Sequence, residues 1–264
     1  DPGEDKEQER RDTYANLLWK RGERNGVQPY SARVLMEHRN YYGPMMVLSG
    51  EADAMISGYS RSFPKVLIPV LETVGRGAGV KRASTMNIMI SPRGPMFLAD
   101  TAINIDPSAE ELAEIAVMTA KEVRAFGFEP IIAMLSFSNY GSSKHPQAKK
   151  VKEAVRLLHQ NHPDLVVDGE IQADFALNQD MGANTFPFSK LANRRVNTLV
   201  FPNLDAANIT YKLLKELHGA KSVGPVMLGL EKPIHILQLG ASVEEIVNMT
   251  AIAVIDAQLR EKMR

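Results

Sequence analysis

A run of apolar residues that passes directly into a polar, glycine-containing segment constrains the fold of this chain most strongly. Residues 131–135 are all apolar, as expected for a parallel strand covered on both faces. Residues 136–143 then supply hydroxyls, an amide and glycine backbone, and a helix is predicted over 147–160. Ligands of open α/β sheets bind at the carboxyl ends of strands, where helix N-termini direct N–H groups at anions. The segment is therefore either a site for a phosphate or carbonyl group, or an ordinary turn that caps the next helix.

Strands and helices alternate through the second half of the chain, which indicates an α/β fold with a largely parallel sheet. Strands are predicted at 130–137, 164–168, 197–201, 225–229 and 233–237, and a helix at 206–217. Upstream, two short apolar strands at 84–91 and 96–100 flank a turn with two prolines, and this pattern predicts a hairpin.

Two helices carry a clear N-terminal signal. Ser108 with Glu111 and Ser242 with Glu245 both have capping-box spacing, which predicts helices over 109–126 and 242–260. The second helix is apolar almost all round, so we expect it to be buried in a core or an interface. A third helix is predicted at 63–74, where Pro69 should kink or break it.

Composition excludes several classes of protein. The 264 residues contain 31 Lys+Arg and 31 Asp+Glu, so the basic surplus typical of nucleic-acid binders is lacking. The chain has no Cys, which excludes disulfides and thiolate metal sites and fits a cytoplasmic location. No apolar run is long enough to span a membrane. The charged stretch 1–11 is neither a signal peptide nor a first strand, and it resembles a connection cut from a longer polypeptide.

Seven motifs in a fixed order resemble the phosphotransacetylase family, the phosphate acetyl- and butyryltransferases. They are residues 50–53 with 57–58 (GEAD, SG), 97–100 (FLAD), 133–138 (AMLSFS), 168–174 (DGEIQAD), 201–209 (FPNLDAANI), 224–225 (GP) and 242–247 (SVEEIV). The resemblance implies two α/β/α lobes with a cleft between them, of the isocitrate/isopropylmalate dehydrogenase-like type, and pairing into dimers. We expect 1–85 plus 238–264 to form the first lobe, lacking the family's N-terminal units, and 86–237 to form the second.

Two longer stretches, 204–217 and 236–249, resemble the C-terminal domain of bacterial hybrid NADP-dependent malic enzymes. That resemblance implies an upstream malic enzyme domain that uses NADP with Mg or Mn to convert malate to pyruvate. It further implies that this domain regulates the enzyme by sensing acetyl-CoA and contributes to a homodimer or a larger homo-oligomer.

The family's catalytic positions are degenerate here. The resemblance places Gln238 and Leu239 at a Ser–Arg pair, Glu245 at an Asp, and Ile68 at a second Arg. A third Arg position falls on Gly22, with Arg21 beside it as a possible substitute. Guanidinium groups bind phosphate in a bidentate manner, and removing one such stabilising group costs about 10²-fold or more in rate. We therefore predict no catalytic residues and no useful acetyl transfer, unless residues such as Arg61 or Arg82 compensate; the alternative is an active phosphate acetyltransferase.

Polar residues that the resemblance places around coenzyme A are retained after two strands and just before the last helix. The predicted acetyl-CoA-binding residues are Ser136, Ser138, Asn139, Gly141, Ser142, Asn203, Ala206, Asn208 and Gln238. No metal site is predicted, although Asp168, Glu170 and Asp174 could alternatively hold Mg²⁺ through oxygen ligands. A third hypothesis is a purely structural oligomerisation domain without a ligand. Neither nucleic acid nor membrane is expected as a partner.

Overall fold

The computed structural model describes residues 1–91, 94–219 and 221–262, and it divides into two compact units. Unit 1 comprises Asp1–Val80 with Leu230–Arg264, and unit 2 comprises Lys81–Gly229. The sequence placed the return to the first lobe at residue 238, whereas the strand at 234–236 already belongs to unit 1. The reason is that this strand pairs with a strand of unit 1 rather than with the larger sheet.

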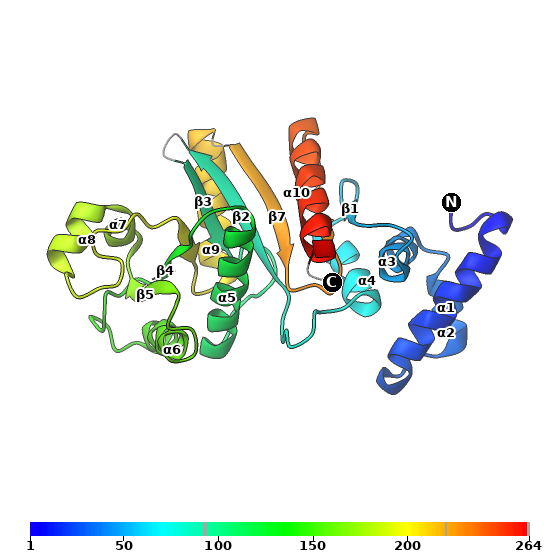
Figure 1. The fold of residues 1–264 in the computed structure, drawn as a ribbon, viewed down its shortest axis with the longest axis horizontal. Coiled ribbons are helices and arrows are strands. Elements are labelled where there is room, and N and C mark those ends of the chain that lie inside the picture. Colours follow the sequence, from blue (N-terminus) through cyan, green and yellow to red (C-terminus); the bar gives the residue numbers. More distant parts are fainter. Residues whose placement is uncertain (92–93, 220, 263–264) are drawn as a thin grey trace. The chain divides into compact units, whose positions relative to one another are not determined.

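Unit 1 is mainly helical around a two-stranded parallel sheet (Figure 1). Its elements are η1 (Asp5–Glu7), α1 (Gln8–Gly22), η2 (Glu23–Asn25), α2 (Pro29–Leu35), α3 (Arg39–Ser49), β1 (Met55–Ser57), α4 (Phe63–Thr73), β8 (Ile234–Ile236) and α10 (Val243–Lys262). The packing of α1, α2 and α3 completely buries Tyr14, Met36 and Met45. Tyr14 meets Tyr42 edge to face with ring centroids 5.1 Å apart, a geometry that aromatic pairs prefer.

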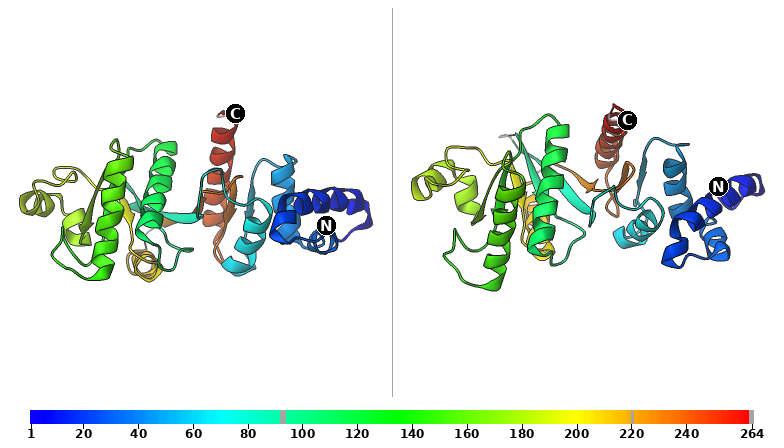
Figure 2. Two further views of the ribbon diagram at one scale, coloured as in Figure 1. Left: turned by 90° about the horizontal axis from the view of Figure 1, so that it is seen from below. Right: turned by 60° about the horizontal axis from the view of Figure 1, so that its bottom comes forward.

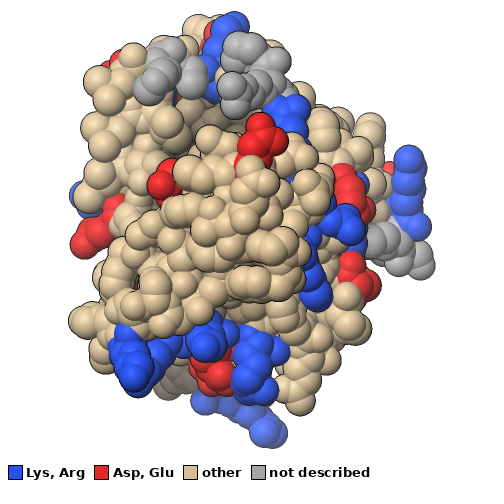
Figure 3. Space-filling view, turned by 90° about the vertical axis from the view of Figure 1, so that its left-hand side faces the viewer, with Lys and Arg blue, Asp and Glu red and all other residues tan. Residues whose placement is uncertain are grey.

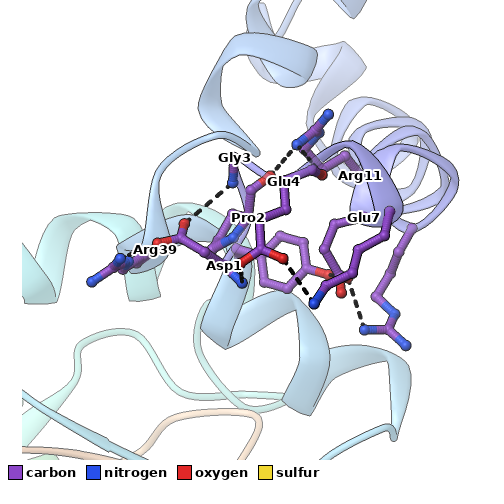
Figure 4. Close-up of polar contacts among 10 residues, drawn as sticks. Asp1, Pro2, Gly3, Glu4, Glu7, Arg11 and Arg39 are labelled. Atoms are coloured by element: carbon purple, nitrogen blue, oxygen red, sulfur yellow. Dashed lines mark hydrogen bonds and ion pairs between the residues drawn. The ribbon is translucent and has the colours of Figure 1, made fainter.

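Polar contacts fasten the first residues of unit 1 to α1 and α3 (Figure 4). Arg11 donates to the carbonyl of Glu4 over 3.1 Å and also reaches the carbonyl of Pro2. The Tyr42 hydroxyl donates to Glu7 over 2.6 Å, and this hydrogen bond lowers the pKa of the Glu7 carboxyl. These contacts therefore link the start of α1 to α3 by side chains as well as by apolar packing.

The expected break at Pro69 does not occur, because α4 runs through it from Phe63 to Thr73. Proline lacks the N–H that would bond the carbonyl four residues earlier, that of Lys65. Asn40 supplies the replacement, since its side-chain Nδ2 donates to the Lys65 carbonyl over 3.2 Å. The Thr73 hydroxyl also donates to the Pro69 carbonyl over 2.6 Å. A hydrogen bond from α3 thus compensates for the missing one within α4.

Unit 2 is built on a six-stranded mixed sheet with the order β5-β4-β6-β3-β2-β7. Its strands are β2 (Ser84–Ser91), β3 (Gly94–Ala99), β4 (Ile131–Leu135), β5 (Val166–Ile171), β6 (Thr198–Val200) and β7 (Lys221–Leu228). Its helices are α5 (Ala109–Ala125), α6 (Pro146–Asn161), α7 (Ala173–Leu177), α8 (Gln179–Thr185) and α9 (Leu204–His218). Strands β5, β4, β6 and β3 are parallel, whereas β2 runs antiparallel to both β3 and β7.

Helices cover both faces of this sheet. Figure 2 shows α5 and α6 side by side on one face and α9 on the other. Tyr211 of α9 packs in one core cluster with Leu135 of β4 and Phe201 after β6. Burial on both faces explains why β4 is a continuous apolar run in the sequence.

Most local expectations are confirmed. Strands β2 and β3 pair as the predicted antiparallel hairpin; residues 92 and 93 of its expected turn lie outside the described residues. Both capping boxes form, with Ser108 N–H donating to Glu111 over 2.8 Å and Ser242 N–H donating to Glu245 over 2.7 Å. The last helix is only partly buried within this chain, and its burial in an interface stays a prediction. Val243, Val247, Val254 and Ile255 of α10 remain exposed in unit 1.

Candidate functional site

The parallel strands of unit 2 bring the predicted polar segments to one edge of the sheet. Strand β6 lies between β4 and β3, and all three run in the same direction. The turn 136–143 after β4, Asn203 after β6 and Asp100 after β3 therefore lie at neighbouring carboxyl ends. Ligands of open α/β sheets bind at such an edge, so its topology agrees with the location expected from the sequence.

A buried carboxylate fills the turn that was expected to receive an anion. Glu170, at the end of β5, is only 1% exposed. Its Oε1 accepts hydrogen bonds from the Gly141 N–H over 2.5 Å and from the Ser138 hydroxyl over 3.1 Å. The side chain of Ser138 is fully buried and also lies 3.1 Å from the Ser142 hydroxyl. The donors of Ser138 and Gly141 are thus engaged by the protein's own carboxylate in this conformation.

Other side chains of the turn are committed to neighbouring loops. Asn139 and Gln172 exchange two hydrogen bonds: Asn139 Nδ2 donates to Gln172 Oε1 over 2.9 Å, and Gln172 N–H donates to Asn139 Oδ1 over 2.7 Å. Ser136 Oγ accepts from the Ser138 N–H over 3.2 Å. The turn is therefore a rigid, internally bonded structure, and of its predicted ligand residues Gly141 and Ser142 are the most exposed.

The N-terminus of α6 is likewise satisfied from within the chain. His145 caps it: its Nδ1 accepts from the Gln147 N–H over 3.3 Å. The His145 carbonyl accepts from the N–H groups of Ala148 and Lys149 over 3.0 and 3.1 Å. An anion near this helix would therefore be contacted by side chains rather than by free backbone N–H groups.

The residues expected after β6 play structural parts. Asn203 caps α9, with its Oδ1 accepting from the Ala206 N–H over 2.9 Å. Asn208 Nδ2 donates to the carbonyl of Thr101 over 3.1 Å, which ties α9 to the loop after β3. These contacts place all three predicted residues at the same edge as the turn after β4, and each is half-buried.

Asp100 organises the loop after β3, a role that the sequence did not reveal. Its carboxylate is 4% exposed and accepts from the N–H groups of Thr85, Ala102 and Asn104 over 3.0, 3.1 and 2.8 Å. The side chains of Thr85 and Asn104 add further hydrogen bonds to it. Carboxylates that accept this many donors rigidify a loop because every lone pair is used.

Tyr140 connects the turn to Asp168 through a short chain of hydroxyl groups. Its OH donates to Ser189 Oγ over 2.6 Å, and Ser189 Oγ donates to Asp168 Oδ2 over 2.9 Å. Burial raises the pKa of the Tyr140 phenol to about 12; the hydrogen bond to Ser189 opposes this increase, and the charges of Asp168 and Glu170 add to it. The phenol therefore stays protonated and donates this hydrogen bond throughout the physiological pH range.

The alternative metal reading of Asp168, Glu170 and Asp174 has no matching geometry. Asp168 accepts from Ser189 and from the N–H of Lys190, Glu170 faces the turn after β4, and Asp174 is exposed at the start of α7. Among the described residues, no three His, Asp or Glu side chains gather as a metal site would require.

Comparison with known proteins identifies the family. The profile of the family described as "Phosphate acetyl/butaryl transferase" matches residues 3–254. A phosphate acetyltransferase from Clostridium acetobutylicum is 37% identical over 254 residues, which cover 94% of this chain and 76% of that enzyme. The chain belongs to the phosphate acetyl/butaryl transferase family.

The structure agrees with this assignment. A phosphotransacetylase from Streptococcus pyogenes superposes with a TM-score of 0.85 at 37% identity, covering 95% of this chain and 74% of that one. The family includes parts of larger proteins. The NADP-dependent malic enzyme of Escherichia coli (strain K12) is 43% identical over 237 residues, which are 89% of this chain and 31% of that enzyme. The chain thus spans less than a third of the length of the malic enzymes that it matches.

The positions that family resemblance linked to catalysis lie in unit 1. Leu239 and Ile68, expected at arginine positions, are 70% and 52% exposed. Glu245 accepts from the N–H of Ser242, so its carboxylate acts as a helix cap, and Gln238 is half-buried before α10. A cavity of about 790 Å³ in unit 1, beside β1 and α10, contains none of these four residues.

Two arginines considered as substitutes already have carboxylate partners. Arg21 donates to Glu231 over 2.8 Å and to the Val74 carbonyl over 3.1 Å. Arg82 pairs with Glu111 at the start of α5. Arg61 is exposed in the loop before α4. Of the three, Arg61 is therefore the one that could contact a ligand without giving up an ion pair seen in the structure.

A buried charged group joins β8 to α10. Asp256 Oδ1 accepts from Arg260 Nε over 2.6 Å, and Asp256 Oδ2 lies 3.5 Å from Nε2 of the fully buried His235. Burial alone would raise the pKa of the Asp256 carboxyl, but the contacts with His235 and Arg260 outweigh it and hold that pKa below its ordinary value. Arg260 also donates to the carbonyls of Leu230 and Glu231, so the group anchors the segment that enters β8.

In the part of the chain that the structure describes, no helix combines the length and apolarity needed to cross a bilayer.

Proposed function

We propose that this chain binds acyl-coenzyme A at the carboxyl edge of the sheet in unit 2. The observation that carries the proposal is the 37% identity with a phosphate acetyltransferase over 76% of that enzyme's length. The rigid turn after β4 and the loops held by Asp100 and Asn208 supply a preformed polar edge of the kind that ligands use. Of the residues predicted from the sequence, Gly141 and Ser142 are the ones open enough to contact a ligand directly.

The first candidate activity is acyl transfer between coenzyme A and phosphate. It follows from the family and from relatives named phosphate acetyltransferase, which the chain covers most fully. In this reading a cationic side chain such as Arg61 would have to neutralise the phosphate, because charge stabilisation is the largest requirement of such a reaction. Glu245 would supply the carboxylate in place of the expected Asp.

The second candidate is binding without transfer, in which acetyl-CoA acts as an effector. A specific observation favours it: Leu239 and Ile68 present exposed hydrocarbon where resemblance expects guanidinium groups. Arg21 and Arg82 are held by carboxylates and do not restore the missing charge. An effector acts by binding one conformation better than another, and this requires no reaction.

Under this second candidate, the whole protein would be an NADP-dependent malic enzyme that decarboxylates malate to pyruvate with a divalent metal. The present chain would regulate that upstream domain and assemble it into a homo-oligomer. The 43% identity with the malic enzyme of Escherichia coli supports this proposal. The exposed apolar residues Val243, Val247 and Val254 of α10 are available for an interface of the oligomer.

One pair of measurements separates the candidates. Acetyl-CoA and coenzyme A are titrated into the chain by calorimetry, and formation of acetyl phosphate from acetyl-CoA and phosphate is assayed in parallel. Turnover would establish the transferase; saturable binding without turnover would establish the effector role. No binding of either compound would refute the proposal.

A gain-of-function variant tests the reasoning about the lost arginines. If charge is what the site lacks, Ile68→Arg with Leu239→Arg should raise acetyl phosphate formation by about 10²-fold over the unmodified chain. Tyr30→Arg with Val34→Arg adds two positive charges at exposed positions on α2 of the same unit and serves as the matched control. An equal increase in the control would mean that general electrostatics, not these two positions, govern the rate.

A further inference from the structure

The strongest unassigned feature of unit 2 is a group of lysines beside the turn after β4. Lys144, Lys149 and Lys152 are all exposed, on or just before α6. In Figure 3, Lys and Arg side chains gather along the lower edge of the face drawn, the side on which Figure 1 draws α6. Lys149 and Lys152 are three residues apart, so they are neighbours on the helix surface.

Lys152 lies directly over the turn. Its Nζ would be 3.6 Å from a Cβ placed on Gly141. Within the described residues, neither Lys149 nor Lys152 forms an ion pair, whereas the adjacent Lys150 contacts Asp106 over 2.5 Å and the Pro202 carbonyl over 3.0 Å. Lys150 therefore links two loops, whereas the ammonium groups of Lys149 and Lys152 have no carboxylate partner among the described residues.

An exposed aromatic ring contacts the residue that caps α6, the helix that carries Lys149 and Lys152. Phe137 is 58% exposed, and its ring meets His145 edge to face with centroids 5.8 Å apart. Its backbone is fixed, because Gln172 Nε2 donates to the Phe137 carbonyl over 2.7 Å. A large apolar ring held in solvent by a rigid turn is a suitable surface on which a planar base can stack.

The combination selects a class of ligand. The backbone donors of the turn and of α6 are already used by Glu170 and His145, so they are closed to an incoming phosphate. Several lysines at the helix surface suit a ligand with more than one phosphate, and the Phe137 ring suits an aromatic base. A nucleotide that carries phosphates at two positions of its ribose meets both requirements.

We infer that Lys149 and Lys152, with Lys144 and the Phe137 ring, bind the 3′-phosphorylated adenosine diphosphate end of coenzyme A. The inference rests on the proposed acyl-CoA binding and assigns which end of the ligand lies against α6. The ammonium groups hold the phosphates, and the ring stacks against adenine. The acyl end would then be free to extend away from α6 along the edge of the sheet.

The test measures calorimetric affinity for coenzyme A, for dephospho-coenzyme A, which lacks the 3′-phosphate, and for adenosine 3′,5′-bisphosphate. The unmodified chain should bind coenzyme A at least about tenfold more tightly than the dephospho form, as expected for loss of a charged hydrogen bond. The double variant Lys149→Ala with Lys152→Ala should remove most of this preference. Phe137→Ala should weaken coenzyme A and its dephospho form equally, by about fivefold or more.

A matched control is Lys121→Ala with Lys212→Ala, which removes two exposed lysines from α5 and α9 of the same unit. This control should keep the preference for the 3′-phosphate. If the chain binds coenzyme A and the Lys149 and Lys152 variant behaves as the unmodified chain does, the inference is wrong and the proposed function stands. If neither coenzyme A nor the bisphosphate binds, both fail.

Discussion

Asp100→Asn should destabilise unit 2 far more than an ordinary loss of charge, because this carboxylate accepts hydrogen bonds on both oxygens. Oδ1 accepts from the N–H groups of Thr85 and Ala102, and Oδ2 accepts from the N–H and side chain of Asn104. An asparagine must turn its NH₂ group toward one of these sets. At least two buried donors then face another donor and lose their acceptor.

The magnitude follows from the cost of an unsatisfied buried donor, which is about 1–3 kcal/mol. Two such donors give a loss of roughly 2–6 kcal/mol, a large part of the 5–15 kcal/mol typical of a folded domain. With a urea dependence of about 2 kcal/mol per molar, a loss of about 3 kcal/mol lowers the midpoint by roughly 1.5 M.

The assay must report on unit 2 alone. The only tryptophan, Trp19, lies in unit 1, so its fluorescence does not monitor the sheet that contains Asp100. Hydrogen exchange followed by mass spectrometry does, through the amides of β2 and of the loop 101–104. Asp180→Asn is the control, since Asp180 is exposed at the start of α8 and its change should cost less than about 1 kcal/mol. Protection and a urea midpoint for Asp100→Asn equal to those of the control would refute the reasoning.

Three further predictions concern other parts of the chain. The pKa of Asp256 is lowered in the folded chain, so the ionised carboxyl stabilises the fold fully above its ordinary pKa of about 4, and this stabilisation is lost as the pH falls further. Asp256→Asn should remove this contribution to the pH dependence of stability, and acid unfolding followed by Trp19 fluorescence measures it. Tyr140→Phe removes a buried hydrogen bond and should cost about 1 kcal/mol in urea unfolding, and spectrophotometric titration should lose a phenol that ionises at about pH 12. Gly58→Ala should destabilise unit 1 by more than about 1 kcal/mol in thermal unfolding, because Gly58 has φ +110° and a Cβ would lie 2.5 Å from the Leu237 carbonyl oxygen.

The elements of the fold could be predicted from the sequence because their signals are local. The capping boxes at Ser108 and Ser242 and the apolar run of β4 each determine their element within a few residues. Pro69 predicted a break that does not occur, because Asn40 on another helix supplies the hydrogen bond that the proline cannot make. The same limit explains the boundary of unit 1, which depends on the pairing of β8 with β1.

The sequence indicates which residues at this edge are polar, but it does not indicate which of their hydrogen-bond donors are free. The serines and glycine after β4 are polar and lie at the expected edge, yet the sequence does not show that Glu170, about 30 residues later, occupies their donors. The role of Asp100 was missed for a related reason: its partner Asn104 lies in the same loop, but its partner Thr85 is on β2, 15 residues earlier in the chain. Which donors are free is a property of the folded loops, whereas which residues are polar is a property of the sequence.

This difference bears on what the site can do. If the donors at Ser138 and Gly141 are held by Glu170, a ligand gains little from them unless the carboxylate moves, and its phosphates must find cations elsewhere. Lys149 and Lys152 supply such cations beside the turn after β4. Leu239 and Ile68 carry no charge at the positions where the family resemblance expects the arginines used in acyl transfer. A chain with positive charge where the nucleotide binds, but without it where the reaction occurs, should bind coenzyme A and form little acetyl phosphate. The binding and turnover measurements together test this separation directly, because affinity and rate would then depend on different residues.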